Sequence, residues 1–210
     1  MSTLVGKEAP RFDAPAVING GQIIEGYSLD QYLDKKYVVF FFYPMDFTFV
    51  CPTELHAFQQ KMEEFDKRDV VVVGCSVDSE YSHFAWLNMP KNEGGIQGVK
   101  YPLVADFSKT IAQRYGVLAA DYDYDEEGNL ICEGNPVALR GLFLIDKKGI
   151  VRHELINDLS LGRSVDEVIR MVDALIHVEK YGEVCPANWM QGDEAIKETN
   201  KSLSDYLSHH

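Results

Sequence analysis

Short apolar runs alternate with amphipathic stretches along this chain, and the apolar runs have the length of β-strands. Three of them are rich in β-branched or aromatic residues and end in polar or turn residues: Tyr37–Tyr43, Val70–Val73 and Leu142–Ile145. Runs that are apolar on both faces predict buried strands. Lys148-Gly149 separates the third run from Ile150–His153, so we expect these two segments to pair as an antiparallel hairpin.

Two longer stretches have the periodicity of helices. Within residues 54–67, apolar side chains recur at spacings of three and four, opposite a charged face: Leu55, Phe58, Met62 and Phe65. Val165–Tyr181 repeats the pattern, with Ser164 as the expected N-cap and Glu167 three residues later. Strands alternating with helices, then a hairpin and a further helix, predict a mixed α/β sandwich with helices around a central sheet.

Length, composition and charge favour one folded domain with an extension and exclude several partners. The chain has 210 residues, of which 46% are hydrophobic, which is enough for a sizeable core. A net charge of −13 argues against nucleic acid or an anionic membrane as the main partner. The N-terminus lacks the pattern of a signal peptide, and no apolar run approaches the roughly 20 residues that cross a bilayer. We therefore expect a cytoplasmic protein.

The cysteines are few and widely spaced: Cys51, Cys75, Cys132 and Cys185. They contain no CxxC pair, which weakens the hypotheses of a disulfide scaffold, a zinc ribbon and a thioredoxin-type dithiol. Cys75 lies in an apolar strand, where we expect an inert thiol. Cys132 follows an acidic segment, residues 121–129, that we expect to form a solvated loop or hairpin. The role of Cys132 stays open.

The segment from Tyr43 to Glu54 carries the candidate chemistry. It leaves a buried strand, crosses a short loop and delivers Cys51 at the start of a helix. Unpaired backbone N–H groups and the helix dipole favour an anion at that position, and the thiolate is the nucleophilic form of cysteine. A cysteine at a strand-to-helix junction is by itself more often structural than catalytic. Pro44 and Thr48 in the same loop favour the catalytic interpretation.

Four segments together resemble a known family. Pro44-x-x-x-Thr48-x-x-Cys51 is similar to the active-site signature of the peroxiredoxins, and the string DFTFVCPTE resembles that of the typical two-cysteine, alkyl hydroperoxide reductase C subgroup. Residues 182–189 resemble the segment that carries the subgroup's resolving cysteine. Residues 139–143 and 158–167 resemble its two arginine segments. The similarity runs in order from Val5 to Trp189, interrupted mainly by the acidic segment.

The resemblance implies a thioredoxin-like fold, with a central mixed β-sheet flanked by helices and a C-terminal extension. It assigns residues 1–170 to the peroxiredoxin domain and residues 171–210 to a helix and arm that carry the resolving cysteine. The implied activity is thiol-dependent reduction of hydrogen peroxide and organic hydroperoxides. That activity requires no metal, haem or other cofactor.

By resemblance, each matching residue has an expected role. Cys51 attacks the peroxide, and the Thr48 hydroxyl forms a hydrogen bond with the substrate. The Arg140 guanidinium stabilises the thiolate and contacts the peroxide oxygens with its fork of donors. Pro44 shields the site from solvent and shapes the pocket.

Two charged residues have supporting roles in this interpretation. Glu54, one turn into the helix, is expected to orient Arg140 or Arg163 through a charge-assisted pair. For Arg163 the alternative is a weak surface pair with Asp158 or Asp166. The motif around Arg163 favours a role in the site or at an interface.

The resemblance also implies a catalytic cycle. The sulfenic acid formed on Cys51 condenses with Cys185 of the partner subunit in a head-to-tail homodimer. Thioredoxin or a flavoprotein disulfide reductase then restores both thiols, and dimers of the family often close into decameric rings. A tail cysteine without a role is the alternative for Cys185. A holdase chaperone or a peroxide-sensing redox relay is the alternative function, and a protein thiol–disulfide oxidoreductase is disfavoured because no CxxC pair is present.

Overall fold

The computed structural model describes residues 3–209. The chain divides into two compact units, Met1–Arg163 and Ser164–His210. The boundary predicted between residues 170 and 171 lies inside helix α5 (Val165–Tyr181) of the second unit.

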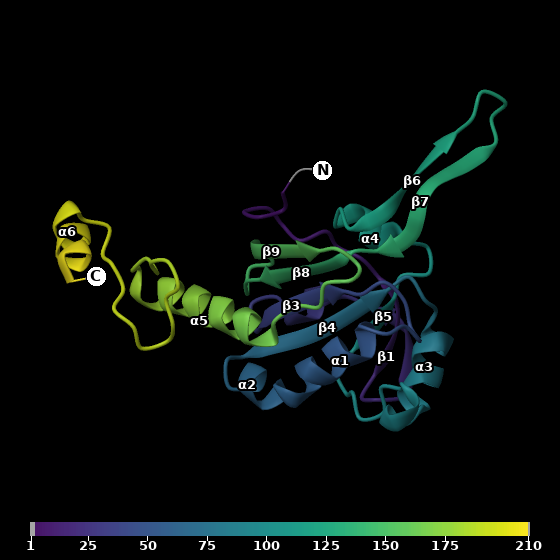
Figure 1. The fold of residues 1–210 in the computed structure, drawn as a ribbon, viewed down its shortest axis with the longest axis horizontal. Helices are drawn as coiled ribbons and strands as arrows, with labels where there is room; N and C mark the ends of the chain where they lie inside the picture. The colour runs from purple at the N-terminus through teal and green to yellow at the C-terminus, as the bar shows by residue number, and fades with distance from the viewer. Residues whose placement is uncertain (1–2, 210) are drawn as a thin grey trace. The chain divides into compact units, whose positions relative to one another are not determined.

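A seven-stranded sheet forms the centre of the first unit, in the order β2-β1-β5-β4-β3-β8-β9 (Figure 1). Strand β3 pairs in parallel with β4, and β4 pairs in parallel with β5, whereas the other pairings are antiparallel. The mixed central sheet expected from the sequence is therefore confirmed, including the antiparallel β8–β9 hairpin. The strands are β1 Ala14–Ile18, β2 Gln22–Tyr27, β3 Tyr37–Phe42, β4 Val70–Ser76, β5 Leu103–Ala105, β8 Arg140–Ile145 and β9 Val151–Asn157.

Short helices surround this sheet: α1 Cys51–Gln60, α2 Met62–Asp66, α3 Glu80–Asn88 and α4 Thr110–Arg114, with 3-10 turns η1 Leu29–Tyr32 and η2 Lys91–Glu93. The single helix predicted over residues 54–67 is interrupted, because the backbone at Lys61 leaves the helical region (φ −102°, ψ 8°). The first helix also begins at Cys51, three residues before the start predicted at residue 54. Pro52 suits this first turn, since a proline there loses no helical hydrogen bond.

Strand β3 is buried on both faces, and its residues alternate between two cores. On one face the rings of Phe40 and Phe42 pack against Tyr115, which follows α4. On the other face Phe41 stacks on Phe58 of α1, with ring centroids 4.4 Å apart. Helical segments thus cover both faces of the sheet, and β3 ends directly before the loop that carries Pro44 and Thr48.

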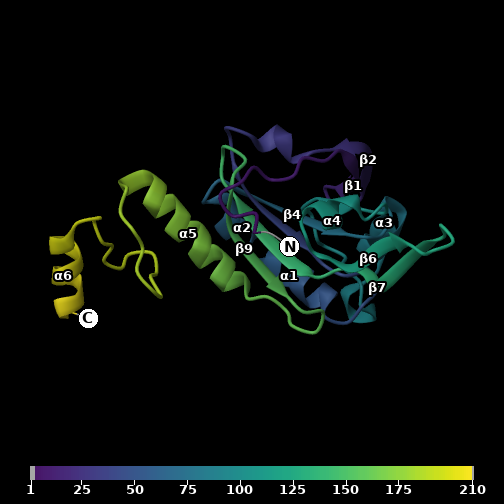
Figure 2. The same cartoon turned by 90° about the horizontal axis from the view of Figure 1, so that it is seen from above.

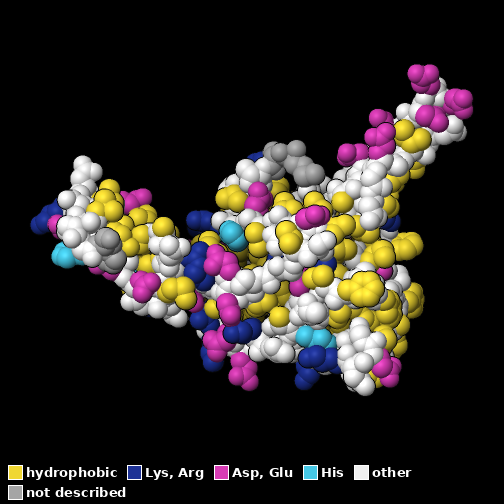
Figure 3. Space-filling view, viewed as in Figure 1, with side chains coloured by type: hydrophobic (Ala, Val, Ile, Leu, Met, Phe, Trp, Pro, Cys, Tyr) yellow, Lys and Arg dark blue, Asp and Glu magenta, His cyan; other side chains and the backbone are white. Residues whose placement is uncertain are grey.

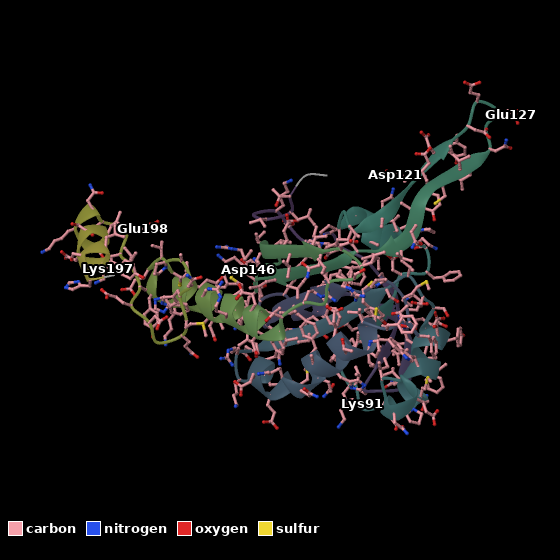
Figure 4. All side chains as sticks on the ribbon, in the orientation of Figure 1. Lys91, Asp121, Glu127, Asp146, Lys197 and Glu198 are labelled. Atoms are coloured by element: carbon pink, nitrogen blue, oxygen red, sulfur yellow. The ribbon has the colours of Figure 1, made fainter. Side chains whose placement is uncertain are left out.

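The acidic segment lies in a separate two-stranded hairpin, β6 Leu118–Tyr124 and β7 Leu130–Ala138, which projects from the first unit (Figures 1 and 2). The surface view shows acidic side chains along it (Figure 3), and two of them, Asp121 and Glu127, are marked in Figure 4. The prediction of a solvated loop or hairpin is confirmed, and the segment forms a hairpin.

In the second unit, α5 begins as its sequence predicts. The Ser164 hydroxyl accepts a hydrogen bond from the backbone N–H of Glu167, and Gly182 ends the helix in the left-handed region (φ 66°). A further helix, α6 (Asn200–His209), follows a connection in which Val184 and Ile196 form an isolated bridge. Among residues 3–209, no helix is long and apolar enough to span a membrane.

Candidate active site

Cys51 is the first residue of α1, and its side chain is completely buried. No side chain caps this end of the helix, so its first backbone N–H groups point toward the loop without a side-chain acceptor. The sulfur accepts a hydrogen bond from the Nη1 atom of Arg140, at 3.4 Å. Arg140 begins strand β8, next to β3, so the sheet brings the arginine to the helix N-terminus.

Glu54 lies one turn after Cys51 on the same buried face of α1, together with Leu55 and Phe58. Its side chain is only 3% exposed, which requires cationic partners for the carboxylate. The Oε2 atom accepts a hydrogen bond from Arg140 Nη1 at 2.6 Å. Arg163 donates from its backbone N–H and from Nε to Oε1, both at 2.8 Å, and from Nη2 to Oε2 at 2.9 Å. Glu54 therefore pairs with both arginines.

Both guanidinium groups are also fixed by backbone carbonyls. Arg140 Nε donates to the carbonyl of Leu159 at 2.7 Å. Arg163 Nη1 donates to the carbonyls of Phe42 at 2.8 Å and of Gly141 at 2.7 Å. The alternative for Arg163 was a weak surface pair with Asp158 or Asp166. The structure does not agree with it, since the Arg163 side chain is 0% exposed.

The charges of this cluster sum to one uncompensated positive charge, because two guanidinium groups surround one carboxylate. Of the two guanidinium groups, that of Arg140 contacts the Cys51 sulfur. In a buried site such an excess favours a neighbouring anion. The cluster thus places a fixed guanidinium donor and a net positive charge next to the Cys51 sulfur.

The loop before Cys51 holds the other two predicted residues. Pro44 is buried directly after β3, and Thr48 is half-buried. The Thr48 hydroxyl donates to the carbonyl of Met45 at 3.0 Å. Within the described part of the chain it forms no hydrogen bond with Cys51, so its oxygen lone pairs remain available as acceptors.

The sequence interpretation missed a buried polar network around Asp46, in the same loop. The Asp46 carboxylate accepts hydrogen bonds from the hydroxyl groups of Tyr43 at 2.9 Å and Ser82 at 2.8 Å, and lies 2.8 Å from His83 Nδ1. Its backbone N–H donates to Asp78 at 2.9 Å. His83, on α3, ties that helix to this loop. The position of Asp46 inside the DFTFVCPTE string was the available signal.

The remaining cysteines differ in their surroundings, and all four are free thiols. Cys75 is buried in β4, where burial and then the charge of Asp106 raise its pKa well above the ordinary value. Cys132 is exposed on the hairpin. Cys185 belongs to the second unit, where burial raises the pKa of its thiol, Arg170 opposes that effect and Glu183 adds to it. Among residues 3–209, no group of three or more His, Cys, Asp or Glu is arranged to hold a metal ion.

A buried cysteine beside a fixed arginine, at a helix N-terminus on a mixed sheet, defines a thiol-based redox enzyme. Comparison with known proteins identifies its family. Residues 5–154 match the family model described as AhpC/TSA family, and residues 174–209 match that of the C-terminal domain of 1-Cys peroxiredoxin. The chain belongs to the AhpC/TSA family, and its function is that of a peroxiredoxin peroxidase.

Individual relatives are similar to this chain over nearly its whole length. It is 48% identical to an alkyl hydroperoxide reductase C of Helicobacter pylori, over 97% of this chain and 96% of the relative. It is 45% identical to a thioredoxin peroxidase of Echinococcus granulosus, over 99% of this chain and all of the relative. The crystal structure of a reduced 2-Cys peroxiredoxin from Plasmodium vivax matches with a TM-score of 0.88 and 45% identity, over 99% of this chain and all of that one. The thioredoxin-like fold of the peroxiredoxins is thereby confirmed.

Proposed function

We propose that this peroxidase reduces hydrogen peroxide and organic hydroperoxides with Cys51 as the attacking thiol. The observation that carries the proposal is the contact of the Cys51 sulfur with Arg140, at 3.4 Å, in a cluster that Glu54 and Arg163 hold rigid. Among residues 3–209, Cys51 is the one cysteine whose sulfur accepts a hydrogen bond from an arginine, whereas the Cys185 thiol donates to the carbonyl of Ala174. That setting supports nucleophilic chemistry, whereas the pKa of Cys75 is raised by burial.

In the first step the Cys51 thiolate donates an electron pair to one peroxide oxygen. A sulfur–oxygen bond forms, the oxygen–oxygen bond breaks, and the other oxygen leaves as hydroxide or alkoxide and takes up a proton. The sulfur is oxidised by two electrons to a sulfenic acid, and the peroxide is reduced by two. Arg140 meets the charge that develops on the leaving oxygen, and because Glu54 already fixes Arg140, little reorganisation is needed.

The loop residues position the substrate in this proposal. Because the Thr48 hydroxyl donates to Met45, it accepts a hydrogen bond from the peroxide O–H rather than donating one. Pro44, which is buried, limits access of water to the oxidised sulfur. The hydrogen bond with Thr48 holds the peroxide in line for attack.

The second step uses Cys185 of the partner subunit in a homodimer. Its thiolate attacks the sulfenic sulfur, a disulfide forms, and the hydroxyl group leaves as water after taking up a proton. Strand β9 is the last strand of the sheet. Its first residue, Val151, already pairs with Gly6 and Lys7, and the edge of the strand beyond Val151 is where we place a second copy. Closure of dimers into a decameric ring is part of the same proposal by resemblance.

A two-electron dithiol donor, thioredoxin or a flavoprotein disulfide reductase, then reduces the disulfide and is itself oxidised. The donor class is supported by a relative named thioredoxin peroxidase. We place the protein in the cytoplasm, where a reducing environment keeps thiols such as exposed Cys132 free.

The test is peroxide consumption coupled to a thioredoxin system, in wild type and three single cysteine variants. Cys51→Ser abolishes consumption. Cys185→Ser keeps one equivalent of peroxide reduction per chain and loses sustained turnover. Cys132→Ser is the matched control and keeps the full rate, since this thiol lies on the separate hairpin.

Non-reducing electrophoresis of the same samples locates the disulfide. One equivalent of peroxide converts wild type into a covalent dimer of about twice 23.8 kDa, and neither Cys51→Ser nor Cys185→Ser forms it. Full turnover by Cys51→Ser would refute the proposed mechanism. Suppression of protein aggregation without any peroxide consumption would favour the holdase alternative.

A further inference from the structure

The hairpin of β6 and β7 has no role in the proposed reaction, and it presents an open sheet edge. Among residues 3–209, β6 pairs with β7 alone, outside the seven-stranded sheet (Figure 1). Edge strands are commonly protected from further pairing by lysine or proline. Strand β7 contains Pro136, whereas β6 contains neither residue type, and residues 121–124 are all exposed. The outer edge of β6 is therefore accessible to another strand.

The turn of the hairpin determines which backbone groups of β6 face this edge. The Asp125 N–H donates to the carbonyl of Asn129 at 3.0 Å, which makes these two residues a hydrogen-bonded pair. Such pairs alternate along an antiparallel ladder, so Tyr122 and Tyr124 turn their N–H and C=O groups away from β7. The Tyr124 N–H donates to Asp123 Oδ1 at 2.8 Å, and an added strand would replace this local bond.

The side chains of β6 alternate between two faces of different chemistry. Asp121 and Asp123 lie on one face, and Tyr122 and Tyr124 lie on the other. Tyr122 is 42% exposed and Tyr124 is 69% exposed, so the aromatic face is open in the part of the chain that the structure describes. A single strand thus offers a row of carboxylates and a row of rings to whatever lies beside it.

Strand β7 continues both faces. Leu130 and Cys132 lie opposite the two tyrosines and extend the apolar face, and Leu130 is 62% exposed. Glu133 lies opposite Asp121 and extends the acidic face, on which Ile131 is the apolar exception. The hairpin is therefore amphipathic although neither of its faces is packed on the body of the protein.

The charge of the hairpin selects the kind of partner. Between Leu118 and Ala138 the sequence has no lysine or arginine and has six acidic residues: Asp121, Asp123, Asp125, Glu126, Glu127 and Glu133. Pairing of two such hairpins from two copies would place like charges side by side, which is unfavourable. A basic segment is attracted instead.

We propose that the outer edge of β6 binds an extended segment of another protein in which apolar residues alternate with lysine or arginine. The backbone of that segment pairs with Tyr122 and Tyr124. Its apolar side chains pack beside the two tyrosines, and its basic side chains face Asp121 and Asp123. Opposite charges and pairs of aromatic with β-branched residues both stabilise neighbouring strands, and added strands are a common mode of peptide recognition.

The test uses isothermal titration calorimetry on the full chain with two peptides of about seven residues, the length of a short strand. Both contain four lysines and three valines; in one the two residue types alternate, and in the other the lysines precede the valines. Wild type binds the alternating peptide at least about fivefold more tightly, because only this order places valine and lysine on opposite faces of a strand. Its affinity falls as salt concentration rises, since the charges are exposed.

Variants of the acidic face test the contacts with lysine. Asp121→Asn/Asp123→Asn weakens binding of the alternating peptide roughly three- to tenfold. The matched control is Glu93→Gln/Glu198→Gln, which removes the same charge from two exposed positions outside the hairpin. The control changes the affinity by less than about twofold, because charges beyond a Debye length are screened.

A variant of the aromatic face tests the apolar contacts. Tyr124→Ser weakens binding roughly two- to fivefold, whereas Tyr81→Ser, at an equally exposed tyrosine of α3 (69%), leaves it unchanged. Hydrogen exchange measured by mass spectrometry locates the added strand: the alternating peptide slows exchange of the amides in residues 121–124. Cys51→Ser binds the peptide as wild type does, so the result does not depend on the peroxidase reaction.

Four results would overturn the proposal. Wild type fails to bind the alternating peptide up to about 1 mM, or binds both peptides equally, which indicates attraction of charge without strand pairing. Exchange slows only in residues 130–133, which places the peptide on the edge of β7. A smaller oligomer of Tyr124→Ser than of wild type, measured by sedimentation velocity, shows that a second copy covers the hairpin.

Discussion

At the residue scale, one buried carboxylate holds an arginine beside the Cys51 thiol. Glu54 holds Arg140 next to the Cys51 sulfur and is itself held by three hydrogen bonds from Arg163. Breaking a buried ion pair on one side leaves an uncompensated charge, which costs more than a surface pair contributes. The geometry of Cys51 thus depends on a residue that does not touch the sulfur.

Replacing Glu54 by glutamine tests this dependence. Glu54→Gln keeps the shape of the side chain but leaves two buried guanidinium groups without a counter-charge. We expect the free energy of unfolding, measured with urea, to fall by about 3 kcal/mol. The rate constant of Cys51 with hydrogen peroxide, measured by stopped flow, falls at least about tenfold because Arg140 is no longer fixed.

The matched control is Glu64→Gln, on α2, whose carboxylate pairs with Lys67 and Arg68 at the surface. We expect this variant to keep the wild-type free energy of unfolding and the wild-type rate constant of Cys51 with hydrogen peroxide. A Glu54→Gln protein as stable and as fast as Glu64→Gln would show that the buried cluster does not position Arg140.

The environment of Cys185 predicts a pH dependence for the resolving step. Burial raises the pKa of this thiol, with Glu183 adding to the shift and Arg170 opposing it. Since the thiolate attacks, disulfide formation accelerates as pH rises through that pKa. Glu183→Gln removes a negative charge and speeds resolution at neutral pH roughly two- to threefold, measured by stopped flow after one equivalent of peroxide.

The control for that experiment is Glu194→Gln, an exposed carboxylate elsewhere in the second unit. In this variant, the rate of disulfide formation varies with pH as it does in wild type. A resolution rate that does not vary with pH would contradict the assignment of Cys185 as the attacking thiol.

At the element scale, the loop between β3 and α1 is attached to α3 through His83. His83 Nδ1 faces the Asp46 carboxylate, and Nε2 faces the carbonyl of Val104 at 3.2 Å. Both partners accept hydrogen bonds, so the doubly protonated imidazolium satisfies both. Burial disfavours this charged form, but the hydrogen bond and charge of Asp46 outweigh it and raise the pKa of His83.

This attachment predicts how stability changes with pH. A group whose pKa is raised in the folded state stabilises the fold fully below its ordinary value, and this stabilisation is lost as pH rises through the raised value. We expect His83→Gln to lower the unfolding free energy by about 2 kcal/mol near pH 6 and to flatten its pH dependence. Asp46→Asn has the same effect on the pH dependence. The measurement is urea unfolding at several pH values. An unfolding free energy of His83→Gln that varies with pH as that of wild type does would contradict this account.

The elements differ in how far the sequence predicts them. Apolar runs located β3, β4 and β8, because burial on both faces leaves a strong pattern. The turn at Lys148-Gly149 located β9. The break at Lys61 between α1 and α2 has no such signal, since no proline or glycine marks it. The motifs predict the candidate site residues, but the joint pairing of Glu54 with both arginines depends on contacts between distant segments.

At the scale of the whole molecule, the cysteines of the proposed cycle belong to different units of the chain. Cys51 lies in the unit Met1–Arg163 and Cys185 in the unit Ser164–His210. The family relationship extends over both units, since the two family models match residues 5–154 and 174–209. Pairing between subunits is a property that a single sequence cannot specify without a resemblance, because it depends on how two copies associate.

The central claim is that peroxide oxidises Cys51, and trapping of the sulfenic acid tests it most directly. Reduced Cys185→Ser protein receives one equivalent of hydrogen peroxide, is unfolded in the presence of a sulfenic-acid-specific 1,3-dione, and is mapped by peptide mass spectrometry. We predict one adduct per chain, on Cys51. An adduct on Cys75 or Cys132 in place of Cys51, or consumption of peroxide with no adduct at Cys51, would contradict the account.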